Sequence, residues 1–476
     1  MPVIALALSV SSCTNDNEPN TSGNNSGDVF TIKANTQDIK NGSPQTRATV
    51  NPNTQESNFI WQNDDKFDLY QSTEIAKANA FTINNSTING NSADFTCNDF
   101  TPADAASYYA FYPQGFTKGE GSAFTYTIPE TAYTQTGNNN TDHLKNGMIM
   151  VADGETSGLE SGISFTHKTA LFRFSVMNYT DTDLTVKSIN LSSAGTACFA
   201  KQYSYTVDGT ESIGDKVSEL NLGFGEGVAI AKDAELKAYT LAIPGDALTA
   251  TGESLTLEVV SDKGFVFSKT FEITAETKFE AGKYYTFNVD INFPLAEAVV
   301  ANLGPDFESD GNNAAGWIKS TGRDNGQGKY KGNSLITVDG VNYLAFNGGQ
   351  TENQDSYLYQ NVTLPIGNYK VEVDVASQEE NGGGRNGVVF GIMNGSDNEF
   401  PLMAETGSPK MWRFGTKENI ICEYNLKQGE YVLGTHTIPF SIDSKSTLTF
   451  GFAIMLVSSP SRYLRVSAIR IIVLMD

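Results

Sequence analysis

The sequence predicts an all-β protein, and three observations support this prediction. Glycine, tyrosine and phenylalanine are abundant, at 44, 20 and 28 of 476 residues, and this mixture favours short strands and turns over long helices. Apolar and polar side chains alternate over many short runs, which is the period of a strand with one buried face. Turn residues separate the runs, and Asp262-Lys263-Gly264 between two alternating runs predicts a hairpin.

The run ISFTHKTALFRFSVMN, at Ile163–Asn178, is the most informative stretch. Its buried side chains are expected at every second residue from Ile163 to Leu171 and then from Phe172 to Val176. A one-residue slip turns every side chain of a strand to the opposite face. Either a β-bulge between Ala170 and Phe172 therefore redirects the strand, or the strand is covered on both faces. Both alternatives predict a central strand.

Length, charge and cysteine content limit the class of protein. A chain of 476 residues is too long for one core and predicts two or three domains. Asp and Glu number 55 against 32 Lys and Arg, and the net charge of -23 argues against nucleic-acid binding. The four cysteines, Cys13, Cys97, Cys198 and Cys422, form no pair at metal-binding spacing, which argues against structural zinc. A disulfide between two of the last three and buried free thiols both remain open.

The N-terminus reads as a targeting segment. The apolar run Val3–Val10 is too short to span a bilayer, which takes about 20 residues. Small residues then precede Cys13, a pattern that resembles the lipobox of bacterial lipoproteins. The resemblance implies a signal peptide over residues 1–12, cleaved before Cys13, and acylation of that cysteine. No basic residue precedes the run, and a chance apolar start is the alternative.

Residues 13–28 are polar and predict a flexible tether between lipid and folded body. Several acyl chains on Cys13 would anchor the chain firmly to a membrane. The folded part is expected to begin at Val29. In VFTIKANT, Phe30, Ile32 and Ala34 alternate with polar residues, which predicts a first strand.

Six segments together resemble the fimbrillin-like proteins, the pilus subunits and related surface lipoproteins of Bacteroides-type bacteria. In order they are Thr46–Ala48, Ile60–Tyr70, Tyr108–Pro113, Met148–Asp153, Phe165–Val176 and Glu280–Ile291. The resemblance covers roughly residues 28–293. It implies two tandem transthyretin-like β-sandwich subdomains, at 29–155 and 156–293.

The resemblance also implies export as a surface lipoprotein of the outer membrane and trimming by an arginine-specific protease. By position, Arg47-Ala48 matches the cleavage site, and cleavage would release Val29–Arg47. An ordinary solvated loop arginine is the alternative for Arg47. Loss of one strand from a sandwich leaves unpaired backbone groups and apolar pockets, which a strand from another pilin subunit can fill. Within the family, that donor comes from the C-terminal region of a subunit.

The sequence offers no catalytic constellation, and we expect no enzyme. Its three histidines, His143, His167 and His436, lie far apart, and His167 is expected to be a half-buried side chain bonded to a backbone carbonyl. The paired carboxylates Asp64-Asp65 and Glu379-Glu380 fall in turn-like surroundings. No glycine-rich phosphate loop precedes a helix, and no cofactor is expected.

Residues 305–476, after a linker at 294–304, resemble the jelly-roll (galactose-binding-like) domains of carbohydrate-binding modules. The features that carry the resemblance are Phe307-Glu308, Gly316-Trp317, the alternating strand TLPIGNYKVEVDV and a hydrophobic closing strand. Many such modules hold a structural calcium between two acids. Glu308 supplies the first, but Ser467 stands where the second is expected, which makes the calcium doubtful.

A sugar bound by this domain would stack on exposed aromatic rings while polar side chains bond its hydroxyls. Trp412, flanked by Lys410 and Arg413, is the first candidate contact. Trp317 is the second, with a core position as its alternative.

Two functional classes follow. The first is a fimbrial subunit, at the tip or as an accessory adhesin, assembled by donor-strand exchange after cleavage at Arg47. The second is a lipid-anchored glycan-binding surface protein that does not polymerise and keeps its first strand. Both place the protein at the cell surface.

Overall fold

The structure is a computed structural model, and it describes most of the chain from residue 29 onward. The described residues are 29–37, 40–41, 60–249, 253–273, 275–298, 300–322, 329–330, 332–347, 354–379, 387–395, 400–401, 403–406, 411–415, 418–428, 430–431, 433–456 and 463–475. Within these ranges the protein is all-β, which confirms the predicted class. The helical elements there are short 3-10 turns: η1 Ser72–Glu74, η2 Asn85–Thr87, η3 Glu120–Ser122, η4 Glu130–Tyr133, η5 Asp142–Asn146, η6 Thr156–Ser161 and η7 Leu295–Glu297.

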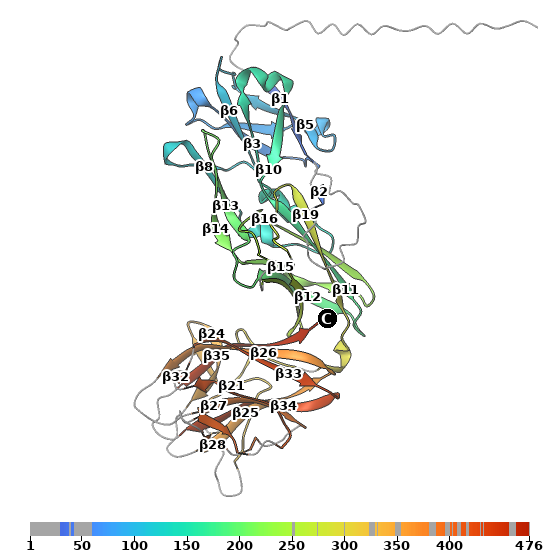
Figure 1. Ribbon diagram of the computed structural model, residues 1–476, viewed down its shortest axis with the longest axis vertical. Helices are drawn as coiled ribbons and strands as arrows, with labels where there is room; N and C mark the ends of the chain where they lie inside the picture. The colour runs from blue at the N-terminus through green and yellow to red at the C-terminus, as the bar shows by residue number, and fades with distance from the viewer. Residues whose placement is uncertain are drawn as a thin grey trace, which may run out of the picture.

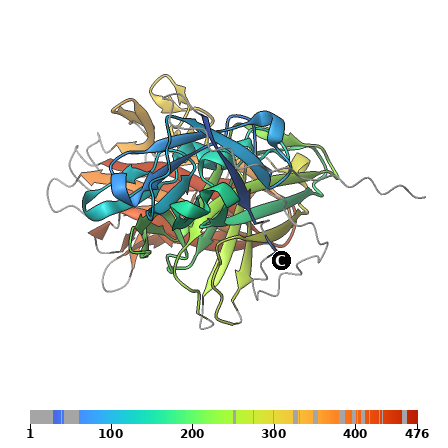
Figure 2. The same cartoon turned by 90° about the horizontal axis from the view of Figure 1, so that it is seen from above.

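Three units lie one above another along the long axis of the molecule (Figure 1). Figure 2 looks along this axis and shows the blue strands of the first unit over the red strands of the last. We call them the N-terminal barrel, the central unit and the C-terminal unit.

The N-terminal barrel is a closed ring of seven strands in the order β1-β10-β9-β6-β3-β4-β5. Their bounds are β1 Val29–Thr36, β3 Lys66–Gln71, β4 Asn79–Ile83, β5 Ser92–Asn98, β6 Ser107–Tyr112, β9 Met150–Glu155 and β10 Ile163–His167. Aromatic rings fill the interior. The ring centroids of Trp61 and Phe95 lie 5.0 Å apart, edge to face, and those of Phe67 and Phe165 lie 5.3 Å apart. Such pairs add stability beyond the apolar area that they bury.

The central unit is built on two sheets. The first has the order β2-β19-β11-β16-β13-β8-β7, with β14 paired to β13, and the second has the order β15-β12-β17-β18. The bounds are β2 Lys40–Asn41, β7 Thr117–Lys118, β8 Ala123–Thr127, β11 Ala170–Asn178, β12 Leu184–Ser193, β13 Phe199–Thr206, β14 Glu211–Val217, β15 Glu219–Ile230, β16 Glu235–Pro244, β17 Ser254–Ser261, β18 Phe265–Glu272 and β19 Lys283–Ile291. The hairpin predicted at Asp262-Lys263-Gly264 is confirmed, since β17 and β18 pair antiparallel across it and Gly264 has φ +80°.

The C-terminal unit also has two main sheets. The first comprises β33, β26, β35, β24 and β23, and the second has the order β22-β25-β34-β27-β30. Their bounds are β22 Ile318–Lys319, β23 Leu335–Val338, β24 Val341–Asn347, β25 Gln354–Leu364, β26 Gly367–Glu379, β27 Gly387–Asn394, β30 Ile420–Asn425, β33 Gly434–Ile442, β34 Ser446–Leu456 and β35 Tyr463–Leu474. Short two-stranded pairs complete it: β20 Ser309–Asp310 with β21 Asn313–Ala314, β28 Met403–Thr406 with β29 Met411–Phe414, and β31 Lys427–Gln428 with β32 Glu430–Tyr431.

The stretch 163–178 resolves into two strands in two different sheets. β10 lies between β1 and β9 in the barrel, and β11 lies between β19 and β16 in the central unit. The chain changes sheet between His167 and Ala170. β10 alternates throughout, whereas β11 alternates only from Phe172 onward, after the consecutive buried residues Ala170, Leu171 and Phe172. The bulge does not occur, the start of β11 is buried on both faces, and both segments are central strands as predicted.

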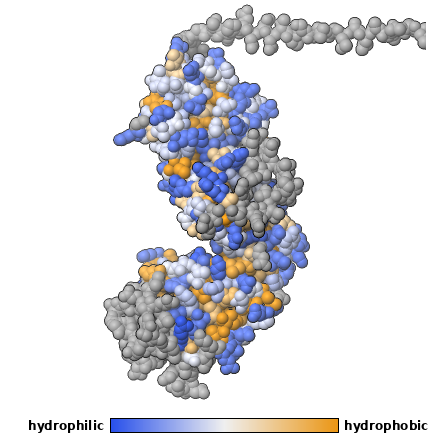
Figure 3. All heavy atoms as spheres, in the orientation of Figure 1, coloured by the Kyte–Doolittle hydropathy of each residue, from blue (hydrophilic) through white to orange (hydrophobic). Residues whose placement is uncertain are grey.

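The strand β35 belongs to two units at once. It pairs antiparallel with β26 on one side. On the other side it pairs first with β24 and then, at Ile471–Leu474, runs parallel to Phe265–Ser268 of β18. Apart from the exposed Leu474, the side chains at this junction are buried, and one hydrophobic cluster continues through both units. Figure 3 shows the molecule narrowing at this level. A shared sheet therefore joins the C-terminal unit to the central unit.

A half-buried carboxyl, that of Glu258, lies close to this junction. Burial raises the pKa of Glu258 on β17, and the negative charge of Glu372 on β26 raises it further. A raised pKa means that the folded chain holds this proton more tightly than the unfolded chain. Ionisation of Glu258 therefore reduces stability as the pH rises through the interval above its ordinary value of 4.5.

We expect Glu258→Gln to raise the melting temperature at pH 7 by about 2 °C, because it removes a partly desolvated charge. The gain should shrink as the pH falls and should vanish below about pH 4.5, where the carboxyl is protonated in both states. Thermal unfolding from pH 4 to pH 8 measures this. The exposed Glu226, on β15, is the matched control, and an equal response of Glu226→Gln would contradict the assignment.

Candidate functional site

The first strand of the chain, β1, fills a slot between β5 and β10 and closes the barrel (Figure 1). It runs antiparallel to β5, from Val29 opposite Asn98 to Asn35 opposite Ser92. It also runs parallel to β10 over Ala34–Thr36. The strand predicted at Val29–Thr36 is therefore confirmed, and its removal would expose the edges of two neighbours.

The alternation of β1 determines which side chains enter the core. Ile32 and Ala34 are fully buried, whereas Thr31 and Lys33 face solvent. The ring of Phe30 packs edge to face on Phe100, with 5.1 Å between their centroids. Full burial of an isoleucine side chain contributes about 2 kcal/mol. The inner face of β1 thus carries a small apolar series that occupies matching space inside the barrel.

The C-terminal end of β1 is held by polar contacts. His167 Nε2 lies 2.9 Å from the backbone oxygen of Gln37 and 3.2 Å from Thr36 Oγ1. The backbone N–H of Thr36 donates to the oxygen of Asn91 at 3.0 Å. The predicted bond from His167 to a backbone carbonyl is confirmed, and the side chain is buried rather than half-buried. His167 is therefore a structural residue that holds the end of β1.

Gly162, directly before β10, permits the close approach of β1. It has φ +94°, and a Cβ added there would lie 2.7 Å from the backbone oxygen of Lys33. A side chain at this position is strained by its backbone conformation and would also push β1 outward.

We expect Gly162→Ala to destabilise the docked strand by about 2 kcal/mol, because it adds both strain and a steric clash. Hydrogen exchange of the β1 amides, followed by mass spectrometry, measures the loss. Gly158→Ala is the matched control, since Gly158 lies in the same segment and has open space around its Cβ position. Unchanged exchange in β1 after Gly162→Ala would show that the contact is unimportant.

The ribbon that contains β1 continues into the central unit. β2 runs parallel to β19, with Lys40 opposite Lys283 and Asn41 opposite Tyr284. The same N-terminal ribbon therefore contributes to two units. Arg47 and Ala48, the predicted cleavage site, and Cys13, the predicted lipidation site, lie outside the described residues.

The candidate glycan contacts fall in different parts of the C-terminal unit. Trp412 lies on β29 opposite Glu405 of β28, and its side chain is outside the described part. Arg413 Nη1 lies 3.1 Å from Oε1 of the buried Glu423 carboxylate, while 43% of the arginine side chain stays exposed. Trp317 is buried; its indole N–H donates to the oxygen of Asn302 at 2.9 Å. Trp317 therefore occupies a core position, which was the alternative given for it in the sequence analysis.

Glu308 and Ser467, the candidate calcium residues, both take part in hydrogen bonds within the described part of the C-terminal unit. Glu308 is exposed, and its backbone bonds to Asn302. Ser467 Oγ donates to the oxygen of Asp374. No group of three or more acidic, histidine or cysteine side chains converges among the described residues.

A family model for fimbrillin-like proteins matches residues 46–304. The chain belongs to the fimbrillin-like family. This membership makes it a surface protein of the pilus or adhesin type, in a family of structural proteins rather than enzymes. No curated protein matches the chain in sequence.

Solved structures include several that align with this fimbrillin-like chain. A putative cell adhesion protein from Bacteroides uniformis has 17% identity and a TM-score of 0.33, covering 55% of this chain and 93% of its own. One from Bacteroides ovatus has 14% identity and a TM-score of 0.32, covering 55% and 92%. The tip fimbrial protein Mfa3 from Porphyromonas gingivalis, with a C-terminal truncation, has 7% identity and a TM-score of 0.28, covering 55% and 94%.

The cysteines of the described part of this fimbrillin-like chain are free thiols. Cys198 and Cys422 are buried, and burial raises their pKa values to about 12 and about 11. Cys97 is partly exposed. Over the described residues, no helix is both long and apolar enough to cross a membrane.

Proposed function

We propose that this fimbrillin-like chain is a subunit of a surface fibre, at the tip or as an accessory adhesin, and that it accepts a strand from another subunit in place of β1. The observation that carries the proposal is the position of β1, which lies between β5 and β10 with its apolar face inside the barrel. Cleavage at Arg47 would cut the chain between this ribbon and Ile60. The segment before the cut would then be held by non-covalent contacts alone.

Release of β1 would leave two rows of unpaired N–H and C=O groups, on β5 and on β10. The positions of Ile32 and Ala34 would become empty apolar pockets. An extended segment with small or branched apolar residues at alternate positions meets both requirements, since its backbone pairs with the edges and its side chains fill the pockets.

The contacts of β35, the last described strand, indicate that this chain keeps that strand and does not donate it to another subunit. β35 pairs with β26, β24 and β18, and its residue Ile471 is fully buried. Its release would disrupt the sheet that the two units share. We therefore propose that β35 remains in place when the fibre forms.

Digestion of the purified chain with an arginine-specific protease tests the cleavage step. The account predicts one early cut and a stable product that begins at Ala48. Arg47→Ala should abolish this product and leave other cuts unchanged. The absence of a product beginning at Ala48 would contradict the processing of this site.

The alternative is a surface protein anchored by lipid on Cys13 that keeps β1, binds glycan and does not polymerise. In this alternative, the contacts of β1 with β5 and β10 persist in the mature protein. In that case Trp412→Ala should lower the signal on a glycan array by about tenfold, since one stacked ring contributes roughly 1–2 kcal/mol. Equal signals from wild type and variant would show that Trp412 is not a contact.

A further inference from the structure

A row of polar side chains crosses the sheet that joins the central and C-terminal units. Asn190 on β12 lies opposite Glu258 on β17, and Glu258 lies opposite Ser268 on β18. Residues next to them along the strands, such as Leu191 and Val259, are fully buried in the core. Because successive side chains of a strand point to opposite faces, the three polar side chains share the face that points away from the core of the central unit.

This outer face is concave at the junction. Val266 and Ile472 lie opposite each other on it, yet they are only 4% and 2% exposed. Glu372 on β26 lies three strands from Glu258, which is about 14 Å along a flat sheet, and its charge still raises the pKa of Glu258. Curvature of the sheet explains both observations, and Figure 3 shows the outline of the molecule indented at this level. We call this indentation the junction notch.

Three polar groups in the junction notch lack partners. The amide oxygen of Asn190 is buried and accepts no hydrogen bond from the described residues. Ser268 is only 4% exposed, and its hydroxyl forms no hydrogen bond within the described part of the chain. The half-buried carboxyl of Glu258 likewise forms neither a hydrogen bond nor an ion pair with any described residue. Buried polar groups are nearly always paired, so these three groups indicate a site for a hydrogen-bond donor from outside the chain.

The cations that face this row do not pair with it. Arg470 Nη2 lies 2.8 Å from Oε2 of Glu372 and 3.4 Å from Oδ2 of Asp374. Lys370 on β26 acts on Glu258 through its charge, and the two form no ion pair in the described structure. The negative charge of Glu258 therefore remains available to a ligand.

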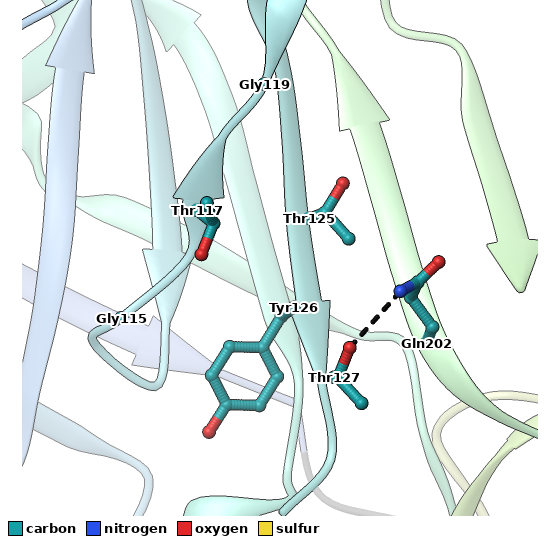
Figure 4. A pocket seen from close by; sticks show the side chains of 7 residues that line it. All are labelled: Gly115, Thr117, Gly119, Thr125, Tyr126, Thr127 and Gln202. Atoms are coloured by element: carbon teal, nitrogen blue, oxygen red, sulfur yellow. Dashed lines mark hydrogen bonds between the residues drawn. The ribbon is translucent and has the colours of Figure 1, made fainter. Parts of the chain in front are cut away.

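The hollow beside β7 and β8 differs from the junction notch in this respect (Figure 4). There Gln202 Nε2 donates to Thr127 Oγ1 at 3.3 Å, and the hydroxyl of Tyr126 donates to the backbone oxygen of Asn146 at 2.6 Å. These groups already have partners within the chain, which makes the junction notch the better candidate for a ligand.

We infer that the junction notch binds the ammonium group of a lysine side chain from a partner protein. An ammonium group has three N–H donors, and the row offers it an amide oxygen, a hydroxyl and a carboxylate. The slender methylene chain of lysine fits a place as enclosed as that of Ser268 better than the planar guanidinium of arginine does. The net charge of -23 also favours a basic partner. This contact is separate from the slot of β1 and does not depend on strand replacement.

Calorimetric titration of the full chain with the peptide acetyl-Gly-Ser-Lys-Ser-Gly-amide tests the proposal. Low ionic strength is used, because a weak ionic contact is then easiest to measure. A peptide with norleucine in place of lysine keeps the methylene chain and removes the charge. We expect the lysine peptide to bind about tenfold tighter than the norleucine peptide, and about threefold tighter than a peptide with arginine at the same place.

Glu258→Gln should weaken binding of the lysine peptide about tenfold or more, and Asn190→Ala or Ser268→Ala about fivefold. Glu226→Gln is the matched control, because it removes one exposed charge elsewhere on β15, and it should change binding less than about twofold. Lys370→Met should strengthen binding, since it removes a like charge near the site. Thermal unfolding checks each variant; should Ser268→Ala fail to fold, Glu258→Gln and Lys370→Met decide the result.

The proposal is overturned if the lysine and norleucine peptides bind alike or if neither binds, because water would then be the partner of the row. It is equally overturned if Glu226→Gln weakens binding as much as Glu258→Gln does, since the peptide would then respond to net charge alone. Binding of free cadaverine as tight as that of the lysine peptide would also overturn it, because the notch would then take a free amine and not the side chain of a protein.

Discussion

Replacing Ile32 with aspartate is expected to open the N-terminal barrel and to lower its free energy of unfolding by about 4 kcal/mol or more. Ile32 is fully buried on β1 and packs among aromatic rings, including those of Trp61 and Phe95. A carboxylate there would lose its hydration without gaining a cation or a set of hydrogen-bond donors. The strand should therefore leave the barrel, and the edges of β5 and β10 should become exposed.

Hydrogen exchange of the β5 and β10 amides measures this opening. Lys33→Asp is the matched control, because Lys33 is the next residue on the same strand and its side chain is exposed. Lys33→Asp should leave hydrogen exchange of the β5 and β10 amides almost unchanged. Equal protection in the two variants would mean that β1 is not a structural member of the barrel.

The second large effect is expected at the strand shared by two units. Ile471 is fully buried on β35, opposite Phe265 of β18 and Val371 of β26. Ile471→Asp should cost about 4 kcal/mol or more for the same reason, and it should do so on both sides of the junction. We expect exchange to rise in β18 as well as in β26.

Ile471→Val is the conservative control, with an expected cost of about 1 kcal/mol. Calorimetry of the aspartate variant should show that the C-terminal unit unfolds at a lower temperature than the central unit. Increased exchange confined to β26 and its neighbours would mean that the parallel pairing with β18 adds no stability.

The local parts of the fold could be predicted from the sequence because they depend on local periodicity. β1 and the hairpin at Asp262-Lys263-Gly264 are of this kind. The change of sheet between β10 and β11 was not predicted, because a strand that slips by one residue and a chain that enters a new sheet leave the same reversal of alternation. The contact of β35 with β18 joins residues about 200 positions apart, and no local pattern indicates it.

The sites differ in the same way. Arg47 was proposed from the family resemblance, and the docked strand before it followed from alternation. The contacts of Gly162 and His167 with β1 were not predicted, because β1 lies about 130 residues earlier in the chain and no local pattern indicates them.

N-terminal sequencing of the protein taken from the cell surface tests the central claim most directly. If β1 is the strand that another subunit replaces, the mature chain begins at Ala48 and the segment Val29–Arg47 is absent. Mature protein that still carries acylated Cys13 and an uncut Val29–Arg47 would contradict strand replacement in this chain.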